Sequence, residues 1–253
     1  ELVVRQKGIV AGLVAAETIL CEVEGAVRWI PHASDGSAVE AGQAVARLEG
    51  SVRDILTTEH ILLNVVSRLS GIATETHAYV RQVDAFKAEI YDTRKTTPGW
   101  RRLEKYAVRC GGGRNHRAGL YDAILIKDNH LAVAPLEDNG MPAVCAACDT
   151  VREFLASQSK EMIVEIEVDD LDQLRDVLPV SPDIVLLDNM EPPTLKQAVS
   201  IRDQLAPEVI LEASGGIRRE TIQAVAETGV DRISVGGLTH SALWLDMGLD
   251  WNR

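Results

Sequence analysis

Long apolar runs are absent from this sequence of 253 residues. No stretch approaches the roughly 20 consecutive apolar residues that a membrane-spanning helix needs, and the first residues lack the order of basic, apolar and small residues that marks a secretory signal peptide. Hydrophobic residues still make up 46% of the chain, which suffices for a sizeable core. We therefore expect a soluble, cytoplasmic protein. Because the chain begins with Glu1 rather than methionine, we also expect that its natural start is missing.

Cysteine is scarce as well. The four cysteines, Cys21, Cys110, Cys145 and Cys148, are too few and too scattered for a disulfide framework, which is consistent with a reducing compartment. Cys145 and Cys148 form a Cys-x-x-Cys pair, but the alanine-rich segment around them has helical periodicity and no second pair of cysteines or histidines lies nearby. We interpret the pair as core packing, with a metal or redox role as the alternative.

The chain as a whole also lacks an excess of positive charge. Its net charge of −12 argues against nucleic acid or an anionic membrane as a general partner. One window differs, because residues 94–127 contain nine basic side chains and only two acidic ones, Glu104 and Asp122. The basic residues are Arg94, Lys95, Arg101, Arg102, Lys105, Arg109, Arg114, Arg117 and Lys127. This window predicts a binding site for a small polyanion; a solvated basic helix face is the alternative.

The first 50 residues are predicted to form a small module that contains β-strands. Short alternating runs at residues 26–32 and 43–50 are separated by turns rich in Asp, Gly and Ser. The turn at Asp35, Gly36 and Ser37 resembles the turn that carries the attachment lysine of biotinyl and lipoyl carrier domains. It holds no lysine, so we do not expect a carrier function.

Residues 51–83 have the apolar spacing of helices. Their apolar residues recur at helical intervals, at Ile55, Leu62, Val65, Val66 and Leu69. The simplest interpretation is two helices, separated near Gly71, that connect the first module to the rest of the chain.

From about Lys87 onward, short apolar strands alternate with helical segments. Six strand candidates lie at residues 88–93, 123–127, 163–168, 183–188, 209–214 and 232–237. Continuously apolar strands that alternate with helices predict an α/β domain with a parallel sheet whose outer face is covered by helices. Nearly every strand ends in a polar or glycine cluster, which favours a barrel with these clusters at one mouth. With only six clear strands, we expect an open, incomplete parallel α/β barrel.

Two glycine clusters follow the last two strands. They are Ser214-Gly215-Gly216 and Gly236-Gly237. Backbone N–H groups at such turns can cradle a phosphate, and the region near the last two strands is the usual phosphate site of these barrels. The two clusters together therefore predict a phosphate site. His240 is expected to open the next helix, as an additional donor or as a structural cap.

Carboxylates occupy two further strand ends. Glu167 and Asp188 are placed where they could accept hydrogen bonds from sugar hydroxyls or hold a hydrated divalent cation. Glu165 lies two residues before Glu167 in the same strand. We prefer Glu167 as the site carboxylate because it lies closer to the strand end. The acids at the start of the next helix are interpreted as helix caps, namely Asp169, Asp170 and Asp172.

Basic residues gather at the ends of the first two barrel strands. Arg94 and Lys95 end one strand and Lys127 ends the next, while His116 and Arg117 follow a glycine turn between them. Arginine offers a planar fork for carboxylates, and lysine offers a compact charge for phosphate oxygens. Five such groups at one mouth would repel one another without a ligand of several negative charges. We therefore predict that they bind such a ligand.

These segments together resemble a known family. The motifs DTRKTTPG, EKYAV, GGG-x-NHR, IKDNH, EIEVD, LLDN, ASGGI and GVDRISVGGLTHS occur in the order and spacing of the quinolinate phosphoribosyltransferases, from about residue 8 to the end. The resemblance implies an N-terminal α/β sandwich domain at residues 1–70, with residues 241–253 packed back onto it, and an open barrel domain at residues 71–240. It also implies a homodimer in which the sandwich domain of one subunit faces the barrel mouth of the other.

The resemblance also implies a reaction and the residues that perform it. The family uses phosphoribosyl pyrophosphate, quinolinate and Mg²⁺, and it forms nicotinate mononucleotide, pyrophosphate and CO₂ in NAD biosynthesis. Lys127, Glu167 and Asp188 resemble its catalytic residues, and the two carboxylates would hold the metal indirectly, through water or substrate. The residues that resemble its substrate contacts are His60, Thr93, Arg94, Lys95, His116, Arg117 and Lys127. Those that resemble its phosphate cradle are Ser214, Gly215, Gly216, Val235, Gly236, Gly237 and His240.

One position departs from the family pattern. The family has an arginine after the glutamate of the bridging helix, and this arginine reaches across the dimer toward a substrate carboxylate. Here Glu59 is followed by His60. Because histidine titrates near pH 6.5, we expect weaker or more pH-dependent quinolinate binding than arginine would give.

Three other functions remain open. A phosphoribosyltransferase for another ring acid, or a paralogue linked to metal uptake, would keep the phosphate cradle but should lack the complete cationic set. A barrel aldolase or isomerase would need a lysine that forms a Schiff base. A non-catalytic protein that binds a phosphoribosyl ligand is suggested only by His60.

Overall fold

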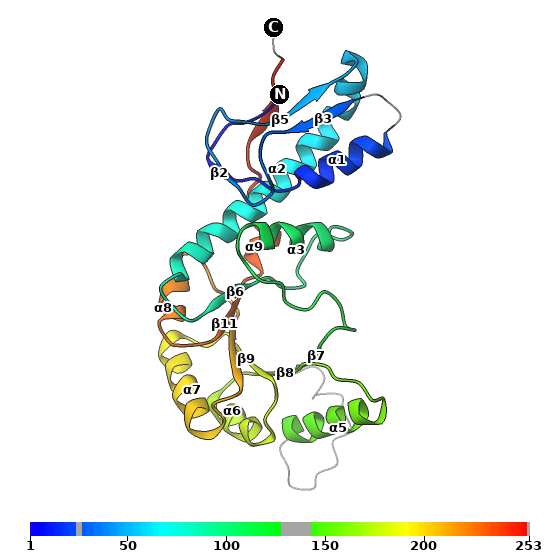
Figure 1. Cartoon of the computed structure of the whole chain (residues 1–253). Helices are drawn as coiled ribbons and strands as arrows, with labels where there is room; N and C mark the ends of the chain where they lie inside the picture. Colours follow the sequence, from blue (N-terminus) through cyan, green and yellow to red (C-terminus); the bar gives the residue numbers. More distant parts are fainter. Residues whose placement is uncertain (24–26, 128–142, 252–253) are drawn as a thin grey trace. The chain divides into compact units, whose positions relative to one another are not determined.

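The computed structural model of the chain describes residues 1–23, 27–127 and 143–251 (Figure 1). The chain forms two compact units. Unit 1 consists of Glu1–Arg81, Lys95–Asn115 and Gly236–Arg253, and unit 2 consists of Gln82–Arg94 and His116–Val235. Because the chain passes between the units directly after Arg94 and directly after Val235, the predicted site residues fall into both units.

Unit 1 contains a four-stranded antiparallel sheet with the strand order β12-β1-β5-β3. Its strands are β1 (Leu2–Val4), β3 (Arg28–Pro31), β5 (Ala44–Glu49) and β12 (Met247–Leu249). A separate short pair consists of β2 (Gly8–Ile9) and β4 (Ala38–Val39). Strands β3 and β5 confirm those expected at residues 26–32 and 43–50, and β12 joins the C-terminal residues to the N-terminal sheet. The division into domains at residues 1–70 and 71–240 stays a prediction.

Helix α1 (Leu13–Glu22) is capped by a side chain from a distant turn. Gly12 at its N-cap position has a φ of 97° and offers no side chain, so the first N–H groups of the helix need another acceptor. The Asp35 carboxylate accepts the Leu13 N–H at 2.9 Å, and the Tyr106 hydroxyl donates to it at 2.7 Å. The turn at Asp35 therefore stabilises α1.

The core of unit 1 lies among the sheet, α1 and helix α2 (Val52–Val83). Val4 and Val45 from the sheet, Leu13 from α1 and Val66 from α2 are buried in it. A fully buried side chain of this size contributes about 1.5–3 kcal/mol. Burial of one face therefore holds α2 against the sheet.

The predicted break near Gly71 is wrong, because α2 is a single helix of 32 residues. Gly71 occurs where another backbone segment approaches closely: a Cβ atom there would lie 2.0 Å from the Leu243 carbonyl oxygen. Glycine costs a helix only about 1 kcal/mol relative to alanine. That cost is small beside the burial of neighbouring Leu69 and Ile72, so the helix continues.

Unit 2 contains a six-stranded parallel sheet with the order β6-β11-β10-β9-β8-β7. Its strands are β6 (Glu89–Tyr91), β7 (Ile124–Ile126), β8 (Val164–Val168), β9 (Ile184–Asp188), β10 (Ile210–Ser214) and β11 (Arg232–Ser234). Within the described residues, β6 and β7 each pair with one neighbour, so the sheet is open. All six predicted strands are present, and the predicted α/β fold class is confirmed.

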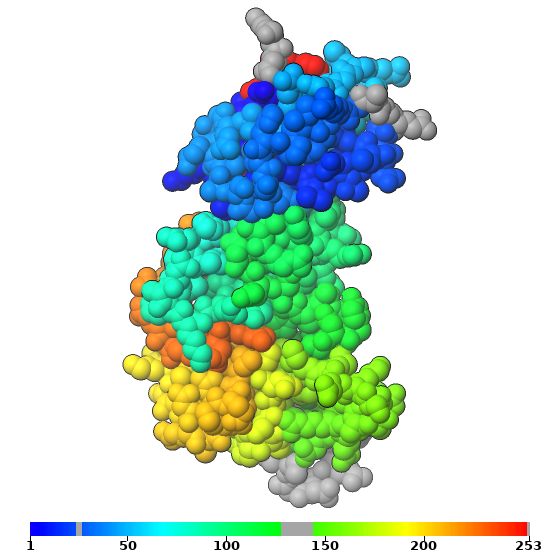
Figure 2. All heavy atoms as spheres, in the orientation of Figure 1, coloured from blue at the N-terminus to red at the C-terminus, as the bar shows by residue number. Residues whose placement is uncertain are grey.

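Helices follow one another along the outer side of this sheet (Figure 1). They are α5 (Ala143–Ser157), α6 (Leu171–Val177), α7 (Pro192–Leu205) and α8 (Ile222–Ala226), with the short 3-10 helix η1 (Leu178–Val180) after α6. In the space-filling view, the green and yellow segments cover much of the visible face of this unit (Figure 2). Cys145 and Cys148 are buried on α5, which confirms the core-packing interpretation. No helix in the described part of the chain has both the length and the hydropathy to cross a membrane.

Replacing Gly71 with alanine tests the close approach to Leu243. Alanine raises helix propensity by about 1 kcal/mol, but the clash with a backbone oxygen forces a shift that costs about 1–3 kcal/mol. We expect a net loss of roughly 1 kcal/mol in the free energy of unfolding, measured by urea denaturation. His77→Ala, at an exposed position of the same helix, is the control. A Gly71→Ala protein as stable as the wild type would contradict this account.

Candidate active site

The carboxyl ends of the six parallel strands lie at one edge of the unit 2 sheet. Predicted site residues occur at every one of these ends. They are Thr93 and Arg94 after β6, Lys127 after β7, Glu167 in β8, Asp188 in β9, Ser214 in β10 and Val235 after β11. Loops at this edge of a parallel sheet commonly form ligand sites. The parallel topology thus brings these residues to one edge.

The strand register determines which of these side chains share a face. Glu167 of β8 and Glu212 of β10 are both opposite Leu186 of β9, and Asp188 is opposite Ser214. Side chains that lie opposite each other in neighbouring strands point to the same face, and so do residues two apart in one strand. The three carboxylates and the Ser214 hydroxyl therefore project from one face of the sheet.

Lys127 forms an ion pair with Glu167. Ile126 is opposite Ile166 in the β7–β8 pairing, so the next residue in each strand places these two charges side by side. An anionic ligand at this edge would compete with Glu167 for the ammonium group. The other residues of the KDNH cluster, 128–130, lie outside the described residues.

Two arginines of unit 2 lie close enough to repel each other. Burial lowers the pKa of Arg117, and the nearby Arg94 guanidinium lowers it further. The Arg117 Nη1 group also donates a hydrogen bond to the Ala123 carbonyl oxygen at 3.3 Å. An anion between two such guanidinium groups would remove the repulsion and accept planar hydrogen bonds from both.

The turn after β10 presents its backbone to solvent. Gly215 and Gly216 have φ angles of 91° and 62°, a conformation that glycine adopts without steric cost. A Cβ atom on Gly215 would lie 2.2 Å from the Asn189 side-chain oxygen, whereas a Cβ atom on Gly216 would meet nothing within 4 Å. Such a turn can offer its N–H groups to an anion. Its phosphate-binding role stays a prediction.

A second group of predicted residues lies in unit 1, around helix α9 (Gly237–His240). A Cβ atom on Gly236 would lie 3.2 Å from His240 Nε2 and 3.4 Å from Lys95 Cδ, so these three residues are neighbours. The Thr239 hydroxyl donates to the Lys95 carbonyl oxygen at 2.8 Å. The expectation that His240 opens a helix is wrong: helical turns begin at the glycine pair, so His240 ends α9.

A buried ion pair supports this group, and the sequence analysis did not identify it. Arg68 of α2 donates to Glu104 Oε1 at 2.7 Å and to the Thr239 carbonyl oxygen. Glu104 of α3 (Arg101–Cys110) is fully buried and also accepts the Thr97 N–H at 3.1 Å and the Thr97 hydroxyl at 2.8 Å. The pair thereby connects α2, α3, α9 and the Thr97 loop. The available signal was that Glu104 is one of two acids in the basic window.

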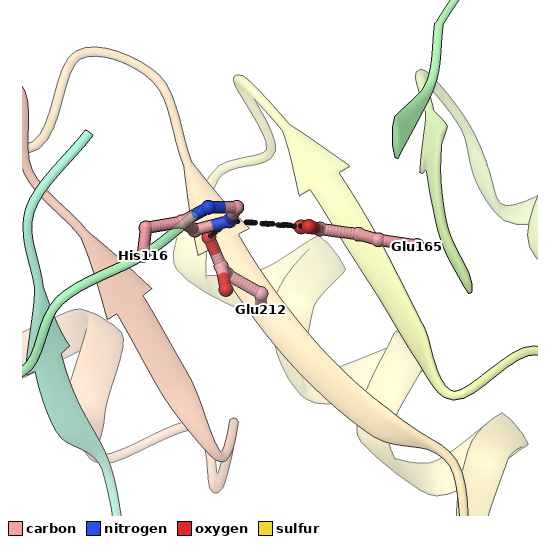
Figure 3. Close-up of side chains that lie close together, drawn as sticks. All are labelled: His116, Glu165 and Glu212. Carbon is pink, nitrogen blue, oxygen red and sulfur yellow. Dashed lines mark hydrogen bonds and ion pairs between the residues drawn. The ribbon is translucent and has the colours of Figure 1, made fainter. Parts of the chain in front are cut away.

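Two buried carboxylates of unit 2 approach the same ring nitrogen of His116 (Figure 3). Its Nε2 atom lies 3.1 Å from a Glu165 oxygen and 3.4 Å from a Glu212 oxygen. On the other side of the ring, Nδ1 accepts the Arg117 N–H at 2.8 Å, and the His116 N–H donates to Asp92 at 2.8 Å. Both ring nitrogens therefore have protein partners. The sequence analysis did not identify Glu212 and preferred Glu167 over Glu165.

The histidine cluster retains a proton at neutral pH. Burial lowers the pKa of His116, but the hydrogen bond to Glu165 and the charge of the nearby Glu212 carboxylate outweigh burial and raise the pKa to about 10. Burial also raises the pKa of Glu165. Because the Arg117 N–H can donate only to an unprotonated Nδ1, the ring carries its proton on Nε2, and the additional proton belongs to the carboxylates.

His60 lies on an exposed side of α2 in unit 1. Large apolar side chains nearby on the same helix are also exposed, namely Val52, Leu56 and Ile61. A stretch of exposed apolar side chains is typical of a surface that contacts another chain.

Sequence models for the two domains of one protein family match nearly the whole chain. The model of the quinolinate phosphoribosyl transferase N-terminal domain matches residues 1–70, and that of the C-terminal domain matches residues 72–250. The chain belongs to the quinolinate phosphoribosyltransferase family.

Relatives of this quinolinate phosphoribosyltransferase family member include curated sequences and solved structures. The nicotinate-nucleotide pyrophosphorylase (carboxylating) of Mycobacterium leprae is 45% identical over 252 residues, covering 99% of this chain and 85% of the relative. The probable enzyme of the same name from Bacillus subtilis is 40% identical, covering 99% and 82%. The structure of the nicotinate-nucleotide pyrophosphorylase from Francisella tularensis has a TM-score of 0.87 and 38% identity, covering 98% and 83%.

The raised pKa of His116 predicts a loss of stability in alkaline solution. An unfolded histidine has a pKa near 6.5, so between pH 6.5 and about 10 only the folded protein keeps this proton. The contribution is fully present below pH 6.5 and is lost as the pH rises through 10. With rising pH, we expect the wild type to lose up to about 1 kcal/mol per pH unit more than the double variant Glu165→Gln, Glu212→Gln, which lacks the carboxylates that hold this proton. Urea denaturation across this range measures the difference, and equal slopes for the two proteins would contradict it.

Proposed function

We propose that this protein transfers a phosphoribosyl group from phosphoribosyl pyrophosphate to quinolinate with decarboxylation. The products would be nicotinate mononucleotide, pyrophosphate and CO₂, in NAD biosynthesis. The observation that carries the proposal is the family match over nearly the whole chain. The charge of Arg94 acts on Arg117, and two such guanidinium groups suit quinolinate because it brings two neighbouring carboxylates and arginine binds carboxylates in planar pairs. Family membership and the names of the relatives support the same reaction.

The proposed binding roles rest on the residue types and on their resemblance to the family's contacts. We assign the quinolinate carboxylates to Arg94 and Arg117, with Thr93 beside them, and the pyrophosphate to Lys95 and Lys127. The 5′-phosphate is assigned to the glycine turns, that is, to Ser214, Gly215, Gly216, Val235, Gly236, Gly237 and His240. The open side of Gly216 supports the last assignment.

The proposed chemistry needs no covalent enzyme intermediate. The pyridine nitrogen uses its lone pair to form a bond to the anomeric carbon, while the bond from that carbon to pyrophosphate breaks and pyrophosphate takes the electrons. Glu167 and Asp188 stabilise the positive charge that develops on the ribose, and Lys127 and Lys95 stabilise the departing pyrophosphate. The carboxylate beside the nitrogen then leaves as CO₂. The electron pair of the broken carbon–carbon bond stays on the ring carbon, where the adjacent pyridinium nitrogen stabilises it, and it then forms a bond to a proton, so that the product ring remains a pyridinium.

Mg²⁺ is the proposed cofactor, and the carboxylates of unit 2 fit it. Glu167 and Asp188 lie on adjacent strands, project from the same face and remain partly exposed. Mg²⁺ is usually held by one or two carboxylates together with water and substrate phosphates. When bound, it would neutralise charge on the pyrophosphate group.

We also propose a homodimer in which His60 of the partner subunit completes the quinolinate site. The exposed apolar side chains of Val52, Leu56 and Ile61 beside His60 support a contact with another chain. A histidine at this position would add a hydrogen-bond donor to the guanidinium groups, and its charge would depend on pH.

A turnover assay with quinolinate, phosphoribosyl pyrophosphate and Mg²⁺, read by absorbance of the product, tests the proposed function. We expect turnover by the wild type and a decrease of at least about 100-fold in kcat for Lys127→Met, because the variant lacks the ammonium group that stabilises the leaving pyrophosphate. Lys160→Met, at an exposed position, is the control. An inactive but folded wild type would refute the function, and full activity of Lys127→Met would refute the role of that lysine.

Replacing His60 with arginine tests the position that departs from the family. Arginine stays charged at all working pH values, whereas the charge of a histidine side chain depends on pH. At neutral and higher pH, we expect a KM for quinolinate several-fold lower in His60→Arg than in the wild type, with less difference in mild acid. His77→Arg, on the same helix, is the control. An unchanged KM at neutral and alkaline pH would show that His60 does not contact quinolinate.

A further inference from the structure

The ring of His116 has no nitrogen that faces away from the protein. Nδ1 accepts the Arg117 N–H at 2.8 Å, and Nε2 is 3.1 Å from Glu165 and 3.4 Å from Glu212. Figure 3 shows both carboxylates, which come from strands β8 and β10, on the Nε2 side of the ring. A direct contact between this ring and a substrate would first require one of these hydrogen bonds to break.

We propose that Glu165 and Glu212 are positioning residues, which hold His116 in the tautomer with its proton on Nε2 and thereby fix Arg117 for binding of a substrate carboxylate. His116 then acts through Arg117 rather than by touching the substrate. This inference rests on the proposed function, because it assigns the quinolinate carboxylate to Arg117.

The contacts lead from the two buried carboxylates through His116 to Arg117. Glu165 and Glu212 have exposed fractions of 1% and 0%, so neither can reach a ligand in solvent, and His116 is their contact toward Arg117. The unprotonated Nδ1 fixes the Arg117 backbone, and the Ala123 carbonyl oxygen accepts from its guanidinium group at 3.3 Å. Hydrogen bonds thus hold both the backbone N–H and the guanidinium group of Arg117, near Arg94.

A metal ion in place of the proton is the strongest competing interpretation of this cluster. One ligand atom each from His116, Glu165 and Glu212 can be chosen so that all lie within 4.8 Å of one another. However, a neutral imidazole that binds a metal through Nε2 carries its proton on Nδ1. That position faces the Arg117 N–H, so metal binding would set two donors against each other.

The two carboxylates differ in their hydrogen bonds, which guides the choice of variants. Nε2 hydrogen-bonds to Glu165, whereas neither oxygen of Glu212 has a hydrogen-bond partner. A buried anion without a donor is costly, so the neutral side chain of glutamine should replace Glu212 with little loss. Leucine has a similar size but removes the acceptor altogether.

Kinetics of four variants test the positioning role. For Glu165→Leu, we expect the KM for quinolinate to rise about tenfold, with the KM for phosphoribosyl pyrophosphate unchanged and a smaller effect on kcat. For Glu212→Leu, we expect a smaller rise in the KM for quinolinate, because the Glu212 carboxylate makes no hydrogen bond to the ring. Glu165→Gln and Glu212→Gln should stay within about threefold of the wild type, because glutamine keeps an acceptor oxygen. Asp231→Asn is the control, since it disturbs an ion pair with Arg202 in the same unit outside this cluster. Leucine variants with an unchanged KM for quinolinate, or with the same effect as the control, would overturn the proposal.

A measurement without substrate separates this inference from the proposed function. In protein labelled with ¹⁵N-histidine, proton–nitrogen correlation spectra distinguish the two tautomers, and His116→Gln identifies the signals. We expect an unprotonated Nδ1 that does not change when Zn²⁺ or Mn²⁺ is added; a protonated Nδ1, or a shift of Nε2 on metal addition, would overturn the inference. If the wild type showed no turnover, the proposed function would fail, and the spectra would still decide how the ring is held.

Discussion

The site of this protein depends on placing charges of both signs at one edge of a parallel sheet. The six strands of unit 2 run in the same direction, so residues that are far apart in the sequence meet at their carboxyl ends. The register then puts Glu167, Asp188 and Glu212 on one face. Without these neighbouring carboxylates, Arg94, Arg117 and Lys127 would repel one another in a partly buried place. The sheet thus builds a balanced cluster of charges, and an anionic ligand can rearrange it.

Buried acids form a second layer that supports the residues at the surface of the site. In unit 2, Glu165 and Glu212 enclose His116. In unit 1, Glu104 joins Arg68 to the segment that follows Lys95. Carboxylates are rarely buried without such partners, because desolvation of a charge is costly. Burial of these carboxylates therefore costs some stability, and it keeps their basic partners in fixed orientations.

Much of this arrangement could be predicted from local patterns in the sequence. The six apolar strands, the alternating helices and the cationic residues Arg94, Lys95 and Lys127 were found from local patterns, because strand periodicity and residue type are properties of neighbouring positions. Two local inferences were wrong. Gly71 was expected to break a helix and His240 to begin one. A glycine in the sequence indicates only that the backbone is free to adopt many conformations. The close approach of Leu243 and the start of α9 depend on residues that are distant in sequence or in space.

The amino-acid sequence by itself determined the fold class, the family and the set of residues at the strand ends, because all three follow from the types and spacing of residues along the chain. Only the tertiary structure decided which side chains are partners. Glu165 and Glu212 are 47 positions apart on different strands, and nothing local shows that both face His116. Strand order and register bring them together, and these depend on packing across the whole sheet rather than on any single segment.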